Sequence, residues 1–127
     1  MITLKTVEEK DEAKVFFEKE NLEFTEFSDC LCAKDREEVL GYCLFDIKDN
    51  IMTIRAIEPQ SDLMLLDGIL RSTLHIAASR NLTEAVYTDK APEKIFKTLG
   101  FLKEENKLNI AKLYESGCSG CKKADSN

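Results

Sequence analysis

The C-terminal part of the chain carries two cysteines, Cys118 and Cys121, separated by a Ser-Gly pair. This spacing is typical of a zinc knuckle, and also of a dithiol that is oxidised and reduced reversibly. A closed structural zinc site needs four ligands, and Cys30 and Cys32, which point to one face of a predicted strand, supply two more if the tail folds back. Three interpretations therefore stay open: a four-thiolate zinc site, a redox pair, and a tail whose thiols have no role.

Two further side chains have the chemistry of acid–base catalysis. Glu58 ends one predicted strand, where a carboxylate can take a proton from an amine, and Tyr87 ends the next, where a phenol can give one. Titratable strand ends are also common without any catalytic role, so the alternative is a solvated Glu58 and a half-buried Tyr87. Arg55, in the same strand as Glu58, can approach an anionic ligand or form a cross-strand charge pair, and of the two we expect the charge pair.

The composition bounds what can surround these residues. The chain has 127 residues, of which 43% are hydrophobic, and this predicts one compact domain over residues 1–116 followed by a tail over residues 117–127. The net charge of −6, with basic residues scattered among acidic ones, argues against nucleic-acid binding. Because no apolar stretch has the length of a signal peptide or a membrane span, we expect a cytoplasmic protein with reduced thiols and no membrane contact.

The first half of the chain predicts one helix and several strands. Alternation of apolar and polar residues begins at Ile2 with a short strand. Thr6, with Glu9 three residues later, has the capping-box pattern and predicts a helix that runs to about residue 20. Tight turns at residues 35–37 and 49–50 then join three strands, which span residues 30–33, 39–45 and 51–58.

Strand 51–58 is predicted to alternate without interruption until Pro59 ends it. One face of the strand then carries Ile51, Thr53, Arg55 and Ile57, and the other carries Met52, Ile54, Ala56 and Glu58. The two sets are expected to contact different layers of the domain.

The second half of the chain predicts a crossover between parallel strands. Apolar residues at helical spacing predict a long helix over residues 62–80, and a strand follows over residues 82–88. Pro92 begins a short helix that Gly100 caps, and residues 102–108 and 109–116 form a weak strand and a last helix. The elements predict an α/β (α+β) fold, with a twisted, mostly antiparallel sheet, one parallel step and helices on both faces.

The order of these elements, the break at Pro59 and the closing Leu99-Gly100-Phe101 together resemble the GNAT superfamily of acyl-CoA-dependent N-acyltransferases. The resemblance covers residues 2 to about 101. It implies a GNAT-like fold, acetyl-CoA or another acyl-CoA as cofactor, and a small molecule or other amine as acceptor. It also implies direct transfer, in which a deprotonated amine attacks the thioester while the strand end around Ile57 and Glu58 positions it and backbone amides polarise its carbonyl.

In that family, a loop of the form Arg/Gln-x-x-Gly-x-Gly/Ala holds the cofactor's pyrophosphate before a long helix. The pattern falls here on Asp62, Leu65 and Asp67, with Leu63 between them, so each signature residue is replaced. A carboxylate about 4 Å from a phosphate costs on the order of 1 kcal/mol in water, against roughly 0.3–1 kcal/mol gained from a helix N-terminus. Repulsion is therefore expected to exceed attraction. Asp62 is also a good N-cap, whose carboxylate takes amides that the family leaves for the cofactor.

The family also carries a tyrosine four residues before the Gly of Leu-Gly-Phe, which protonates the departing CoA thiolate. Phe96 stands at that position and has no proton to give. The resemblance therefore implies a divergent N-acetyltransferase with weak or lost activity, in which Glu58 and Tyr87 are candidate catalytic groups. The alternatives are a non-catalytic GNAT-fold module that binds a ligand, metal or protein, and redox chemistry at the terminal cysteine pair. The oligomeric state stays open.

Overall fold

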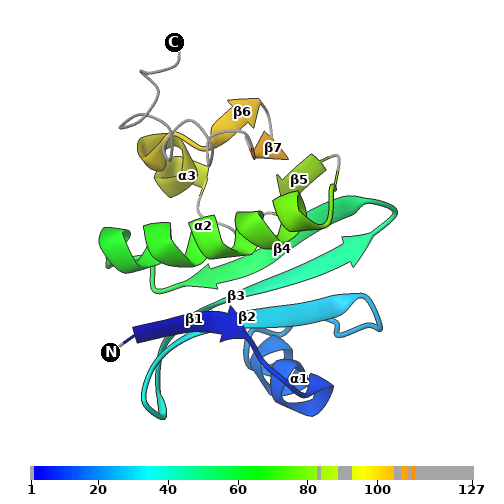
Figure 1. Ribbon diagram of the computed structural model, residues 1–127, viewed down its shortest axis with the longest axis vertical. Helices are drawn as coiled ribbons and strands as arrows, with labels where there is room; N and C mark the ends of the chain where they lie inside the picture. Colours follow the sequence, from blue (N-terminus) through cyan, green and yellow to red (C-terminus); the bar gives the residue numbers. More distant parts are fainter. Residues whose placement is uncertain (1, 83, 89–92, 105–106, 109, 111–127) are drawn as a thin grey trace.

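The computed structural model describes residues 2–82, 84–88, 93–104, 107–108 and 110. In this part of the chain, seven strands form one sheet in the order β1-β2-β3-β4-β5-β7-β6 (Figure 1). The elements follow one another as β1 (Ile2–Thr6), α1 (Lys10–Lys19), β2 (Ser28–Asp35), β3 (Glu38–Lys48), β4 (Ile51–Glu58), α2 (Leu63–Ser79), β5 (Glu84–Tyr87), α3 (Glu93–Leu99), β6 (Leu102–Glu104) and β7 (Lys107–Leu108).

The sheet is antiparallel from β1 to β4 and becomes parallel between β4 and β5. Helix α2 makes the crossover between these two strands, because a tight turn cannot join parallel neighbours. Between β3 and β4, the backbone turns with φ values of 55° at Asp49 and 64° at Asn50, the left-handed geometry of a two-residue hairpin. The predicted mixed sheet with one parallel step is confirmed.

Helix α1 begins later than predicted, and the capping-box interpretation of Thr6 is wrong. Thr6 is the last residue of β1, and Val7 continues the pairing with β2 by donating its N–H to the Cys30 carbonyl at 3.0 Å. The N-cap of α1 is Glu9, whose side chain makes no capping hydrogen bond. Hydrogen bonds to a neighbouring strand therefore outweigh a local helix-start pattern.

The C-terminal strand prediction is also corrected. Residues 102–108 do not form one strand, because β6 and β7 pair antiparallel with each other and β7 pairs with β5. Gly100 follows α3 with a φ of 86°, as a glycine C-cap does. Residues 109–116, where a helix was predicted, and residues 117–127 lie outside the described residues, apart from Ile110 in a turn.

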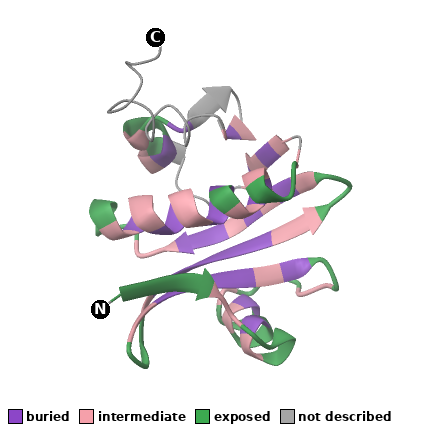
Figure 2. Cartoon of the chain, viewed as in Figure 1, coloured by how far each residue is buried: buried purple, intermediate pink, exposed green. Residues whose placement is uncertain are grey.

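Helices cover both faces of the sheet, and each face has its own core (Figures 1 and 2). On the α2 face, the buried residues are Leu31, Ala33, Cys43, Phe45, Met52, Ile54, Ile57, Leu66, Ile69, Leu70, Leu74, Ala77, Ala85, Tyr87, Phe96, Phe101 and Leu108. On the α1 face, they are Ala13, Phe17, Cys30, Cys32, Tyr42, Leu44 and Ala56. Of the helices in the described residues, none combines the length and apolar character that a membrane crossing needs.

A β-bulge in β4 changes which residues face each helix. Consecutive residues of β3 pair with Ile54 and Ala56, so Arg55 has no partner in the ladder. The bulge inverts the alternation: Ala56 packs on the α1 face, and Ile57 returns to the α2 face with Ile54. The predicted uninterrupted alternation, which put Ile54 and Ile57 on opposite faces, is therefore wrong beyond Arg55.

Candidate active site

Strand β4 extends beyond its parallel partner at the end that leads into α2. β5 pairs with residues 51–54 of β4, and the Thr88 N–H then donates to the Ile54 carbonyl at 3.1 Å. The Thr88 hydroxyl donates to the Arg55 carbonyl at 3.3 Å, so Thr88 hydrogen-bonds the backbone at the bulge. Among the described residues, residues 56–58 pair with β3 alone. We call residues 56–58 the open edge of β4, because their backbone groups can hydrogen-bond a ligand lying between the ends of β4 and β5.

Helix α2 begins shortly after the open edge and carries a carboxylate at its N-terminus. Asp62 is the N-cap, as predicted: its side chain accepts the Leu65 N–H at 3.1 Å, and its carbonyl accepts the Leu66 N–H at 2.9 Å. Leu63 and Met64 follow with exposed side chains. The helix end where the resemblance places a pyrophosphate therefore has a negative group of its own.

Asp67 lies further along α2 and is paired. Its Oδ2 lies 2.9 Å from Nε of Arg71, and its Oδ1 accepts the same N–H at 3.1 Å. The Arg71 guanidinium also lies over the Phe101 ring, 5.0 Å from its centroid. Arg71 therefore compensates the charge of Asp67, and Asp62 accounts for most of the repulsion expected between the two carboxylates and a pyrophosphate.

Phe96 and Tyr87 both pack in the α2-face core. Phe96 is fully buried, and its ring meets the Tyr87 ring edge-on with centroids 5.2 Å apart. Tyr87 lies opposite Ile54 in the parallel ladder. Glu58 lies four residues beyond Ile54, which is about 13 Å along a strand. The structure therefore does not bring Glu58 and Tyr87 together.

Glu58 belongs instead to a row of side chains that crosses the α1 face. Directly opposite residues of antiparallel neighbours share a face. The ladders pair Lys5 with Cys32, Cys32 with Tyr42, and Tyr42 with Glu58. We call these four residues the cross-strand row; it runs from β1, at the edge of the sheet, to the open edge of β4.

Tyr42 is the best-anchored member of the cross-strand row. Its hydroxyl donates to a Glu20 carboxylate oxygen, its ring packs on Phe16 with centroids 5.0 Å apart, and the Lys19 ammonium lies 5.9 Å from its centroid. Burial, the bond to Glu20 and the charge of Glu58 raise the pKa of Tyr42, so the hydroxyl keeps its proton. Tyr42 and its partner Glu20 could not be predicted from the sequence, because only a register that includes the bulge sets Tyr42 opposite Glu58.

A cavity of about 490 Å³ opens at the other end of the cross-strand row. Residues of β1, β2, the turn after β2 and the start of α1 line it. Its lining combines Lys5, Lys34 and Arg36 with four glutamates, and Cys32 also contributes to it. Lys34 Nζ lies 3.2 Å from a Glu12 carboxylate oxygen in this lining. The cavity is therefore polar and belongs to the α1 side of the sheet.

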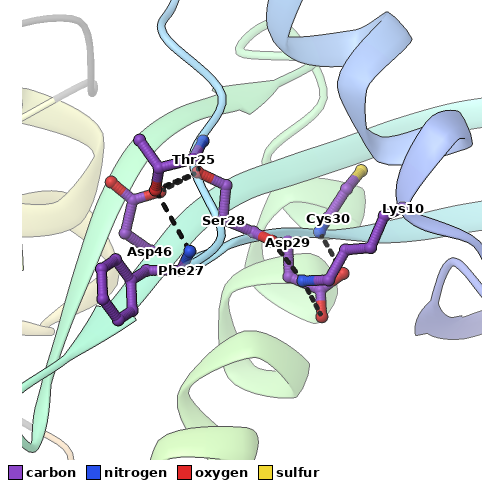
Figure 3. A network of polar contacts seen from close by, with 7 residues as sticks. All are labelled: Lys10, Thr25, Phe27, Ser28, Asp29, Cys30 and Asp46. Carbon is purple, nitrogen blue, oxygen red and sulfur yellow. Dashed lines mark hydrogen bonds and ion pairs between the residues drawn. The ribbon is translucent and has the colours of Figure 1, made fainter.

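A polar network fixes the start of β2 against β3 (Figure 3). The buried Ser28 hydroxyl donates to Asp46 Oδ1 at 2.7 Å and accepts the Thr25 N–H at 3.0 Å. Asp46 Oδ2 in turn lies 2.8 Å from Arg55 Nη1, which confirms the predicted cross-strand charge pair. Arg55 is thereby engaged within the sheet, and the network supports the bulge from the α1 side.

Cys30 and Cys32 lie on one face of β2, as predicted. They are 0% and 3% exposed, and their Sγ atoms are 3.8 Å apart. Within the described part of the chain, no group of three or more His, Cys, Asp or Glu residues is arranged to hold a metal ion. Cys118 and Cys121 lie outside the described residues, so the four-thiolate zinc site stays a prediction.

Comparison with known proteins gives matches by structure and none by sequence. No protein-family model and no curated protein sequence matches the chain. One similar solved structure is a ribosomal-protein-alanine N-acetyltransferase from Brucella melitensis biovar Abortus 2308, with a TM-score of 0.62 and 12% identity over 83% of this chain and 95% of that one. Another is a proposed GNAT-family acetyltransferase from Desulfovibrio desulfuricans, with a TM-score of 0.60 and 12% identity over 83% and 87%. The chain has the GNAT fold.

A third GNAT-fold neighbour was solved with its ligand. The proposed N-acetyl transferase YhhK from E. coli, bound to coenzyme A, has a TM-score of 0.54 and 11% identity over 84% of this chain and 95% of its own. At this identity the likeness shows the fold alone. The roles of individual residues rest on their positions in this chain.

Proposed function

We propose that this chain is an N-acyltransferase that takes an acyl group from an acyl-CoA, such as acetyl-CoA, and transfers it to an amine. The observation that carries the proposal is the open edge of β4, which has no β5 partner among the described residues and leads into α2 in a fold shared with acetyltransferases. An amide-containing arm can add to this edge through backbone hydrogen bonds. The thioester carbonyl then lies beside backbone N–H groups near Ile57 and Glu58, which can stabilise an oxyanion.

Glu58 is the proposed base on the acceptor side. Its place beside Tyr42 puts its carboxylate on the α1 face at the open edge, where it can take the proton that the amine loses. As the C–N bond forms, the C–S bond breaks and the thiolate leaves. Phe96 cannot protonate that thiolate, and the raised pKa of Tyr42, whose hydroxyl donates to Glu20, makes Tyr42 a weak acid. Tyr87, at the end of β5, is therefore the candidate acid.

The two ends of the acyl-CoA fit this site unequally. The open edge of β4 suits the thioester arm, because among the described residues its backbone pairs with β3 alone. Asp62 opposes the diphosphate, because a carboxylate about 4 Å from a phosphate costs on the order of 1 kcal/mol even in water-like surroundings. It also takes the Leu65 amide for itself. We therefore propose weak binding that a single negative charge limits.

An Asp62→Asn variant tests this binding site. Asparagine still caps a helix, so the variant loses the charge and keeps the fold. We expect its Kd for acetyl-CoA, measured by calorimetry, to fall by about 5- to 10-fold, the equivalent of about 1 to 1.4 kcal/mol. Asp49→Asn is the matched control: it removes one charge at the far end of β4, beyond a Debye length, and should leave the Kd within twofold.

If neither the natural chain nor Asp62→Asn binds acetyl-CoA at millimolar concentration, the proposed function is overturned. Turnover is assayed as release of free thiol with a polyamine, an amino acid and a peptide with a free N-terminal alanine as acceptors. Glu58→Gln should lower kcat by about 100-fold or more, as loss of a general base does, and leave the affinity for acetyl-CoA within twofold.

The second candidate function is a GNAT-fold module that binds its ligand without turnover. Two observations favour it: Phe96 is fully buried at the position where the resemblance places an acid-donating tyrosine, and Asp62 occupies the helix N-terminus. Tight binding of acetyl-CoA by Asp62→Asn, with no thiol release from any acceptor by either protein, would support this module over the enzyme.

A further inference from the structure

The thiols of Cys30 and Cys32 form a pair that the acyltransferase proposal does not use. Two residues apart in β2, they point to the α1 face with their sulfur atoms 3.8 Å apart. Cys43, which is also buried, belongs to the core of the opposite face. The two sulfur atoms, which are soft metal ligands, therefore lie close to each other and on the opposite face from the third described cysteine.

The backbone around this pair is fixed on several sides. Asp29 Oδ1 accepts the Cys30 N–H at 2.8 Å, and Lys10 of α1 donates to the Ser28 carbonyl at 2.6 Å (Figure 3). β2 also lies between β1 and β3, with Cys32 paired to Lys5 and to Tyr42. The sulfur atoms are thus presented by a central strand and not by a mobile loop.

Two lysine side chains lie near the cysteine pair on the α1 face. Lys34, two residues after Cys32 in β2, lines the cavity together with Cys32 and is paired with Glu12 at 3.2 Å. Lys5, opposite Cys32 on β1, lines the same cavity. A monovalent cation with two thiolates carries a net charge of −1, and the Lys5 ammonium, on the strand opposite Cys32, can balance it.

We propose that Cys30 and Cys32 form a two-thiolate site for one soft monovalent metal ion, Cu(I), which enters through the cavity that Cys32 lines. Thiolates select such soft ions. With metal–sulfur bonds of about 2.3 Å, the present 3.8 Å separation spans a bent S–metal–S angle of about 110°. Rotation about the two Cα–Cβ bonds widens the angle toward the linear arrangement of two-coordinate Cu(I). Binding replaces the thiol protons by metal–sulfur bonds and changes no oxidation state.

The geometry favours a metal site over two other uses of the pair. A disulfide requires Cα atoms about 4.4–6.8 Å apart, and residues two apart in an extended strand lie at the upper end of that range. Tetrahedral zinc needs further ligands, and no third His, Cys, Asp or Glu among the described residues completes a metal-binding group. Two thiolates alone satisfy a low-coordinate ion.

The test uses the full chain with Cys118→Ser and Cys121→Ser, which removes the second dithiol. Under anaerobic, reducing conditions, Cu(I) is titrated against bathocuproine disulfonate, whose coloured Cu(I) complex reports what the protein withdraws. We expect one Cu(I) per chain. Adding Cys30→Ser or Cys32→Ser should raise the Kd more than about 100-fold, beyond the 10- to 100-fold that losing an outer-shell partner costs. Cys43→Ser, a matched buried thiol on the other face, should stay within threefold.

Circular dichroism of each metal-free variant checks folding, and Cys30→Ala and Cys32→Ala provide second variants if a serine destabilises the core. The proposal is overturned if the folded Cys30 and Cys32 variants bind Cu(I) within threefold of the parent. It is equally overturned if the Cys43 variant loses binding to the same extent, or if the parent withdraws no Cu(I).

Discussion

The two faces of the sheet bury different kinds of side chain. The α2 face is closed by aliphatic and aromatic residues of α2, α3 and the strands, and Cys43, the one thiol in this core among the described residues, is fully buried. The α1 face has a smaller core in which Cys30, Cys32 and Tyr42 lie beside the carboxylates of Glu20 and Glu58. One face therefore supplies most of the apolar burial that stabilises the fold, and the other gathers the groups that can move a proton or bind an ion.

The largest effect on this comparison is expected from Leu70→Ala. Leu70 is fully buried on the α2 face, so the variant leaves a cavity and should lower the free energy of unfolding by about 2–5 kcal/mol. Met64→Ala, in the same helix but 88% exposed, should change it by less than about 0.5 kcal/mol. Urea unfolding measures both. Equal losses in the two variants would contradict the assignment of stability to the α2 face.

Gly41→Ala tests the close contact between Gly41 and Glu58 at the end of β4. A Cβ at Gly41 would lie 2.5 Å from the Glu58 carbonyl oxygen and 2.7 Å from Ile69 Cδ1, so backbone has to move. We expect a loss of about 1–3 kcal/mol, as overpacking costs, together with weaker binding of acetyl-CoA.

Gly68→Ala is the matched control for that variant. Gly68 lies inside α2, and its added Cβ would meet only a Leu4 methyl group at 3.7 Å. Because alanine favours a helix over glycine, we expect a gain of about 0.5–1 kcal/mol. If Gly41→Ala is as stable as the natural chain, Gly41 does not pack closely against Glu58.

A third effect is expected at Cys43, whose buried thiol should lower the free energy of unfolding at alkaline pH. Burial raises the pKa of the Cys43 thiol from 9.0 to about 12. Below pH 9 the thiol is neutral in the folded and unfolded chains, and its contribution is constant. Between pH 9 and 12 only the unfolded chain loses the proton, so the free energy of unfolding should fall by about 1.4 kcal/mol per pH unit.

Urea unfolding between pH 8 and 10.5 measures this fall, and Cys43→Ala removes it. The difference in unfolding free energy between the natural chain and the variant should therefore narrow by about 2 kcal/mol over that range. A constant difference across the range would show that the α2-face core does not shield the thiol.

The smallest effect is expected on the α1 side, at the ion pair of Lys34 and Glu12. Their side chains are 33% and 42% exposed, so water screens the 3.2 Å contact. A double-mutant cycle with Lys34→Gln and Glu12→Gln should give a coupling of about 0.2–1 kcal/mol. A coupling above about 2 kcal/mol would mean that the cavity wall is as rigid as the opposite core.

Much of the fold could be predicted because its boundaries have local signals. The turn residues Asp49 and Asn50 and the break at Pro59 delimit β4 at the residues predicted for it, Ile51–Glu58. Asp62 was predicted as the N-cap of α2 because its side chain can reach an amide of the first turn, and it does. The pairing of Asp67 with Arg71 was missed, although a spacing of four residues is a signal that the sequence contains.

The candidate site could be predicted only in part, because it depends on pairing between strands. Nothing local to Arg55 marks it as the bulged residue, and the bulge decides that Tyr42 faces Glu58. Thr6 shows the same limit, because it has a helix-start pattern in the sequence but pairs with β2 in the structure. The face and neighbours of Glu58 follow from the register of the whole sheet.

Binding of acetyl-CoA at the open edge of β4 is best tested by amide hydrogen exchange, followed by NMR, with and without saturating acetyl-CoA. If the thioester arm adds to the open edge of β4, exchange should slow at the amides of residues 56–58 and the resonances of Tyr42 and Glu58 should shift, with the α2-face core around Leu70 unchanged. Unaltered exchange at residues 56–58 with acetyl-CoA bound elsewhere on the chain would contradict this mode of binding.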